Sequence, residues 1–190
     1  SNAKYDLFES DFASFSEAVL QLTNDCKRQC GACGENFCPM CVHKDDISDM
    51  LDLYEWEKVI DKLEMLNCKS FVLTGGDVTL CSCFYDVVKY IVSKSLDVTV
   101  CLNESAPEIP IDKSVKIKIF VTNFDSLDGI FQRYEEFVDV TLCCYFAREK
   151  IDVPENFHVC FCKDDVCEEN ISCSDLMTFH NRMHTSQCKK

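Results

Sequence analysis

Residues 70–77, with the sequence Ser-Phe-Val-Leu-Thr-Gly-Gly-Asp, carry the clearest fold signal in the chain. The apolar run from Phe71 to Leu73 is typical of a buried strand, and Gly75 and Gly76 end that strand abruptly. Glycines lack a Cβ, so a ligand can approach their backbone closely. The segment therefore predicts a buried strand that leads directly into a candidate binding loop.

Similar apolar segments recur on both sides of this strand and alternate with helical patterns. We expect further strands at 18–23, 98–102, 115–121, 138–146 and 158–162, and helices at 46–66, 84–95 and 127–137. The 46–66 stretch could hold one amphipathic helix or two abutting ones. Strands separated by helical segments predict βαβ units, a parallel sheet and an α/β fold. Six strands are too few for an eight-stranded barrel, so we expect an open, partial (β/α)6 barrel.

A chain of 190 residues is the size of one ordinary domain. Residues 1–3, Ser-Asn-Ala, resemble the remnant of a cleaved expression tag and are set aside, so we expect the natural chain to start near Lys4. We assign residues 4–170 to the partial barrel. Residues 171–190 are then a cysteine-containing tail of the same domain, with a possible helix at 171–183.

The charge of the chain argues against nucleic acid as a partner. The formal net charge is −14, whereas proteins that bind phosphate backbones present clustered Lys and Arg. The sequence also contains no apolar run near the roughly 20 residues that a bilayer-spanning helix needs, and no signal segment. We therefore expect a soluble, cytoplasmic protein without a membrane partner.

Sixteen cysteines are present, and without a secretory signal they favour metal or redox chemistry over a disulfide framework. One group crowds a single loop: Cys26, Cys30, Cys33, Cys38 and Cys41. A second group lies near the C-terminus: Cys160, Cys162, Cys167, Cys173 and Cys188. The remaining six fall in or beside apolar segments, where we expect buried packing: Cys68, Cys81, Cys83, Cys101, Cys143 and Cys144.

The first of these loops contains the strongest chemical motif. Cys26-Lys-Arg-Gln-Cys30-Gly-Ala-Cys33 is a C-x3-C-x2-C arrangement that directly follows the first expected strand. Three thiolates on one tight loop can hold three irons of a [4Fe–4S] cluster and leave the fourth iron open for a ligand. The spacing predicts an iron–sulfur site at Cys26, Cys30 and Cys33.

Together the two motifs resemble the radical S-adenosylmethionine (SAM) superfamily over residues 18–80. Members of that family carry this cluster loop after the first barrel strand and a Gly-Gly-Glu-Pro segment after the second, where this chain has Gly75-Gly76-Asp77-Val78. The resemblance implies that Gly75, Gly76 and Asp77 bind the amino group of SAM. It also implies an electron donor that reduces the cluster and reductive cleavage of SAM to start radical chemistry. Cysteine-rich tails in the family often accompany peptide maturation, which implies a peptide or protein substrate.

Three alternatives remain open. Cys30, Cys33, Cys38 and Cys41 form two C-x2-C pairs that could bind zinc with His43 nearby, or the loop could hold no metal. The tail cysteines, or His180 and His184 with them, could bind a second metal. Ala32 stands where the family usually has an aromatic residue, and Asp77 replaces the usual glutamate. These differences favour a non-catalytic, degenerate or zinc-binding module that serves as a subunit of a peptide-maturation complex.

Overall fold

The computed structural model describes residues 16–26, 50–144, 152–163 and 166–167, and this part of the chain has an α/β fold. The strands are β1 (Glu17–Thr23), β2 (Ser70–Gly75), β3 (Asp97–Asn103), β4 (Lys116–Val121), β5 (Val140–Cys144), β6 (Phe157–Lys163) and β7 (Val166–Cys167). The helices are α3 (Leu53–Met65), α4 (Phe84–Ser93) and α5 (Leu127–Tyr134), with short 3₁₀ turns η1 (Val78–Leu80) and η2 (Phe124–Ser126). None of the described helices combines the length and apolar character needed to cross a bilayer.

The strands lie in the sheet in the same order as in the sequence, from β1 to β7. Strands β1 to β6 are parallel, and only the short β7 pairs antiparallel, with β6. The parallel α/β sheet expected from the sequence is thus confirmed, and the sheet is open. Because the six strands run the same way, their carboxyl ends share one edge, which is where open α/β sheets usually bind ligands.

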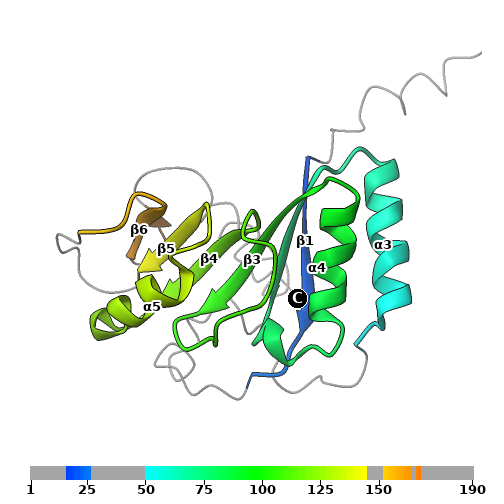
Figure 1. The fold of residues 1–190 in the computed structure, drawn as a ribbon. Helices are drawn as coiled ribbons and strands as arrows, with labels where there is room; N and C mark the ends of the chain where they lie inside the picture. Colours follow the sequence, from blue (N-terminus) through cyan, green and yellow to red (C-terminus); the bar gives the residue numbers. More distant parts are fainter. Residues whose placement is uncertain (1–15, 27–49, 145–151, 164–165, 168–190) are drawn as a thin grey trace, which may run out of the picture.

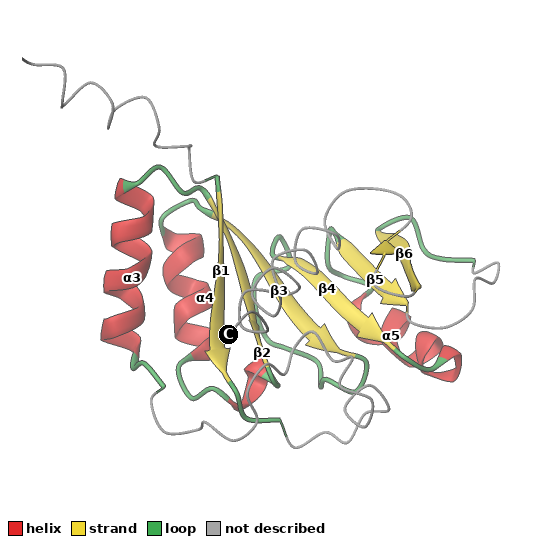
Figure 2. Ribbon diagram, turned by 180° about the vertical axis from the view of Figure 1, so that it is seen from behind, coloured by secondary structure: helices red, strands yellow, loops and turns green. Residues whose placement is uncertain are grey.

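All three described helices cover the same face of the sheet. In Figure 2 the strands lie in front of α4 and α5, and in Figure 1 these helices lie in front of the strands, with α3 next to α4 in both views. The buried residues Trp56 and Ile60 of α3 belong to the same core cluster. This arrangement follows from the strand order, since a crossover between parallel strands is right-handed in nearly all cases. The β3–β4 connection has no helix. Instead, its apolar residues Ala106 and Ile109 are buried, and Tyr134 of α5 donates a hydrogen bond to the Pro107 carbonyl at 2.9 Å.

The hydrophobic core lies between the helices and this face of the sheet. Alternate residues of each parallel strand point into it, for example Leu20, Leu73, Val100, Ile117 and Val140, which the strand register aligns across the sheet. The remaining strand residues point to the opposite face, called here the open face because no described helix covers it. The open face is more polar and includes Gln21, Thr74, Thr99, Lys118 and Thr141.

Most element boundaries agree with the sequence expectation, but the helix predicted at 127–137 ends at Tyr134. Two starts also differ, for identifiable reasons. Of the one or two helices predicted over 46–66, residues 46–49 lie outside the described part, and the described helix α3 begins at Leu53. It begins there because Asp52 accepts a hydrogen bond from the Glu55 N–H while Glu55 accepts one from the Asp52 N–H. This reciprocal capping box fixes a helix start. The strand predicted at 138–146 begins at Val140, since Val138 is 65% exposed and follows the turn in which Phe137 bonds Tyr134. The helix expected at 171–183 lies outside the described residues.

Candidate functional site

The carboxyl ends of β1 and β2 meet where the sequence predicts the cluster loop and the SAM-binding segment. The Gly76 N–H donates to the Thr23 carbonyl at 2.8 Å, and the Asp77 N–H donates to the Asp25 carbonyl at 2.8 Å. The Asp25 N–H in turn donates to the Thr23 hydroxyl at 2.9 Å. These bonds continue the β1–β2 pairing past the strand ends, so Cys26 lies beside the glycine segment.

Both glycines are required by this close approach. A Cβ on Gly75 would lie 2.4 Å from the Thr23 carbonyl oxygen, and Gly75 has a φ of +151°, a region that favours glycine. A Cβ on Gly76 would lie 2.4 Å from the Asp25 carbonyl oxygen and 2.9 Å from the Cβ of Cys26. The group that approaches these glycines in the structure is the 23–26 backbone. Their predicted contact with a cofactor stays a prediction.

Asp77 is buried at 3% exposure and caps the turn that follows. Its Oδ1 accepts hydrogen bonds from the Thr79 N–H at 3.2 Å and the Thr79 hydroxyl at 2.5 Å. A capping carboxylate of this kind orders the first turn of a helix. Oδ1 of Asp77, the residue predicted to bind SAM, therefore already has a structural role as the cap of this turn.

Of the predicted cluster ligands, Cys26 is described and half-buried, whereas Cys30 and Cys33 lie outside the described residues. So do the zinc alternatives Cys38, Cys41 and His43, and the position of Ala32. Within the described part of the chain, no three His, Cys, Asp or Glu side chains gather as a metal site would require. The metal prediction thus rests on the sequence and on the position of Cys26.

The C-terminal cysteines are only partly described. Cys160 on β6 is half-buried, and the strand register places Cys162 of β6 opposite Cys167 of β7. Cys173, Cys188, His180 and His184 lie outside the described residues. The possible second metal site stays a prediction.

Sequence reasoning missed a carboxylate at the same edge of the sheet, at the end of β3, the strand next to the one that Gly75 ends. Glu104, directly after β3, accepts hydrogen bonds from the Thr122 N–H at 2.8 Å, the Thr122 hydroxyl at 2.6 Å and the Asn123 N–H at 3.0 Å. Ser126 adds a fourth bond at 3.2 Å, and Arg133 donates to the Glu104 carbonyl at 2.8 Å. Glu104 thereby fixes the loop between β4 and α5. Its partners are 18 or more residues away, so no local motif marks it.

Two further thiols lie just beyond the glycine segment. The Sγ atoms of Cys81 and Cys83 are 3.4 Å apart, and both residues are at least partly buried. Burial, with a smaller contribution from the Cys81 thiol, raises the pKa of Cys83 to about 12. A thiol with so high a pKa is a poor nucleophile and a poor metal ligand at neutral pH. The pair is consistent with the packing role expected from the sequence, and Cys68, Cys101, Cys143 and Cys144 are likewise buried.

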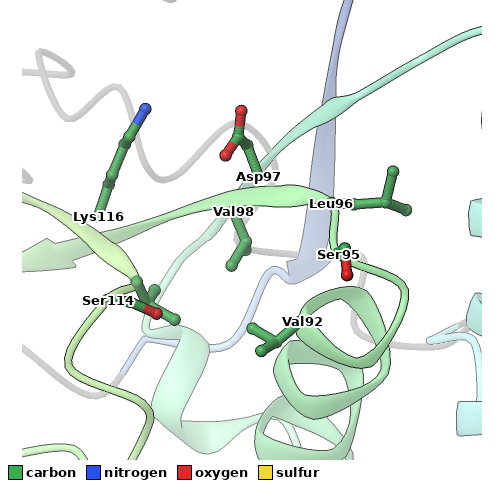
Figure 3. Close-up of a pocket in the computed structure, with 8 residues that line it drawn as sticks. Val92, Ser95, Leu96, Asp97, Val98, Ser114 and Lys116 are labelled. Carbon is green, nitrogen blue, oxygen red and sulfur yellow. The ribbon is translucent and has the colours of Figure 1, made fainter.

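A cavity of 280 Å³ opens at the amino ends of β3 and β4, next to the end of α4 (Figure 3). Its lining includes Val92, Ser95, Val98 and Ser114. It lies at the opposite edge of the sheet from Gly76 and Glu104, because the amino and carboxyl ends of parallel strands are separated by the strand length. The cavity is therefore distinct from the predicted site.

No protein-family model matches the chain, and no curated protein matches it in sequence.

Proposed function

We propose that this protein is a radical SAM enzyme with a partial (β/α)6 barrel, and that it acts on a peptide or protein. The observation that carries the proposal is the contact between the two motifs. The backbone of Thr23 and Asp25 and the Cβ of Cys26 lie against Gly75 and Gly76, although these segments are about 50 residues apart in sequence. SAM must reach the cluster and its amine-binding segment at once, and this contact brings those elements together.

Two groups of residues in this chain would bind the two cofactors. Cys26, Cys30 and Cys33 would hold a [4Fe–4S] cluster, and Asp77 with the Gly75–Gly76 backbone would bind the SAM amine. A carboxylate and an ammonium form a strong, charge-assisted hydrogen bond. When bound, the cluster and an external electron donor supply the electron that cleaves SAM reductively. The sequential order of parallel strands with helices on one face supports the partial barrel.

Anaerobic reconstitution with iron and sulfide tests the proposal. We expect visible charge-transfer absorbance and about four irons per chain, the number in a [4Fe–4S] cluster. Replacing Cys26, Cys30 and Cys33 with Ala should abolish both signals. The matched control replaces Cys38 and Cys41, which should leave both intact. With a strong reductant, the loaded protein should convert SAM to methionine and 5′-deoxyadenosine. A cluster that survives the first triple change and disappears with the control would refute the assignment.

The alternative, a non-catalytic module of a maturation complex, is favoured by a specific observation. Asp77 is almost fully buried and its Oδ1 caps η1, so its carboxylate already has a role without SAM. Titration calorimetry of the cluster-loaded protein separates the two functions. Saturable SAM binding supports the enzyme. Absence of binding at millimolar SAM supports the module, and zinc rather than iron in the purified protein would support its zinc-binding form.

A further inference from the structure

Thr79 directs two hydrogen bonds to a single oxygen of Asp77. The Thr79 N–H donates to Oδ1 at 3.2 Å, and the Thr79 hydroxyl donates to the same atom at 2.5 Å. The χ2 torsion of an aspartate has a broad range, so a carboxylate that is not held can turn about it. Because both bonds end on Oδ1, Thr79 fixes the plane of the carboxylate and therefore the position of Oδ2.

The main chain that carries these two side chains is also held in place. The Asp77 N–H donates to the carbonyl of Asp25, the residue before Cys26, at 2.8 Å. Val78, which lies between Asp77 and Thr79, is 1% exposed and belongs to the hydrophobic core, and Thr79 itself is half-buried. The carboxylate of Asp77 therefore has a fixed position relative to the start of the predicted cluster loop.

The same pairing occurs at Asp112 and Ser114, in a different setting. The Ser114 N–H and hydroxyl donate to Oδ1 of Asp112 at 2.8 and 2.7 Å. Both residues are exposed and come just before β4, at the amino edge of the sheet, where the pair shapes a surface turn. Asp77 is only 3% exposed and follows β2, at the carboxyl edge, where open α/β sheets bind ligands. The pairing at Asp77 thus orients a buried carboxylate within the candidate site.

We propose that Thr79 is a positioning residue for SAM, which holds Asp77 in the orientation from which its carboxylate accepts a hydrogen bond from the SAM amino group. The inference rests on the proposed function, because that function makes an amino group the ligand of Asp77. Aspartate is one methylene shorter than glutamate, so it reaches an amine from fewer orientations. Ordering one binding side chain before the ligand arrives raises affinity by about three- to tenfold.

Titration calorimetry of the cluster-loaded protein, without reductant, tests this role. Thr79→Val keeps the N–H and the size of the side chain but removes the hydroxyl, so SAM should bind about three- to tenfold more weakly. Thr79→Ser keeps the hydroxyl and should bind SAM within about twofold of the wild type. Ser114→Ala is the matched control, because it removes the same kind of hydroxyl–carboxylate bond at the opposite edge of the sheet. Its SAM affinity should also stay within about twofold.

A second ligand separates positioning from a general loss of structure. 5′-Methylthioadenosine has the nucleoside of SAM but lacks the amino group, so Thr79→Val should leave its affinity within about twofold. Thr79→Ala serves as the second variant should the Val protein fail to fold, and it should show the same selective loss of SAM affinity.

The inference is overturned if Thr79→Val binds SAM as tightly as the wild type, if it weakens both ligands equally, or if Thr79→Ser does not restore SAM binding. It also fails if Thr79→Val and Thr79→Ala both unfold the protein. A wild type that binds no SAM would refute the proposed function together with this inference, whereas normal SAM binding by Thr79→Val would refute the inference alone.

Discussion

Gly76 and Asp25 lie so close together that the backbone carbonyl of Asp25 occupies the space where a side chain at position 76 would lie. The Cβ of any residue at position 76 would lie 2.4 Å from the Asp25 carbonyl oxygen, well inside van der Waals contact. The obstructing atom belongs to the backbone, so it cannot move aside by a rotamer change. The glycine therefore fixes how the end of β1 meets the end of β2, with or without a cofactor.

Gly76→Ala should destabilise the protein by about 1–3 kcal/mol, the usual cost of inserting a methyl group into packed structure. The matched control is Gly129→Ala in α5, where a Cβ would meet only the end of the flexible Arg133 side chain at 3.3 Å. That change should be neutral or stabilise by up to about 1 kcal/mol, because Ala has the higher helix propensity. Urea unfolding of both variants measures the difference. Equal stability of Gly76→Ala and wild type would disprove the close contact.

Asp77→Asn should separate capping from ligand binding. Asn caps helical turns about as well as Asp, so we expect unfolding free energies within about 0.5 kcal/mol of the wild type. The charge is lost, however, and SAM affinity of the cluster-loaded protein should fall about ten- to a hundredfold. Asp77→Ala should lose the cap as well, at a cost of about 1 kcal/mol. Calorimetry that shows unchanged SAM affinity in Asp77→Asn would leave the carboxylate with its capping role alone.

Glu104→Ala should lower the free energy of unfolding by about 2–4 kcal/mol, because it leaves the Thr122 and Asn123 N–H groups without the carboxylate that accepts their hydrogen bonds. Glu104→Gln retains one oxygen and should cost less. Glu108 provides a control, since its side chain is 67% exposed and lies 3.9 Å from Lys113. Glu108→Ala should change stability by no more than about 0.5 kcal/mol. Similar losses in Glu104→Ala and Glu108→Ala would contradict the structural role of Glu104.

The Cys83 thiol should react slowly with iodoacetamide. With a pKa of about 12, its thiolate fraction at pH 8 is roughly a thousandfold below that of an ordinary cysteine, and labelling followed by peptide mass spectrometry should show this. Burial is the largest cause of the shift, so Cys81→Ala should leave Cys83 slow. Labelling of Cys83 at the rate of unfolded protein would show that the thiol is accessible.

The same pKa shift predicts a loss of stability at alkaline pH. Below about pH 9 the thiol is protonated in both folded and unfolded chains, so its contribution is constant. Between about pH 9 and 12 the unfolded chain loses this proton while the folded chain retains it, so the free energy of unfolding falls as pH rises. Cys83→Ser should show a smaller decrease across this window in unfolding measurements. Identical pH profiles for both proteins would contradict the raised pKa.

The strands, the helices and the parallel sheet could be predicted because their signals are local. Apolar runs such as Phe71–Leu73 and the glycines that follow can be recognised in the sequence without knowing which residues lie next to them in the folded protein. Glu104 could not be found this way, since its four partners come together only when β3 pairs with β4. The start of α3, by contrast, was readable from the Asp52 and Glu55 capping box.

The sequential strand order has a consequence for how the chain reaches its fold during synthesis. Each parallel strand from β2 to β6 pairs with the strand made just before it, so no strand must be inserted between two that are already joined. The sheet can grow outward from the β1–β2 pair as translation proceeds, and each new strand finds its template already in place. In a partly synthesised chain, the last strand made would then have an unpaired edge, and this edge is the surface that a chaperone or another unfinished chain would contact first.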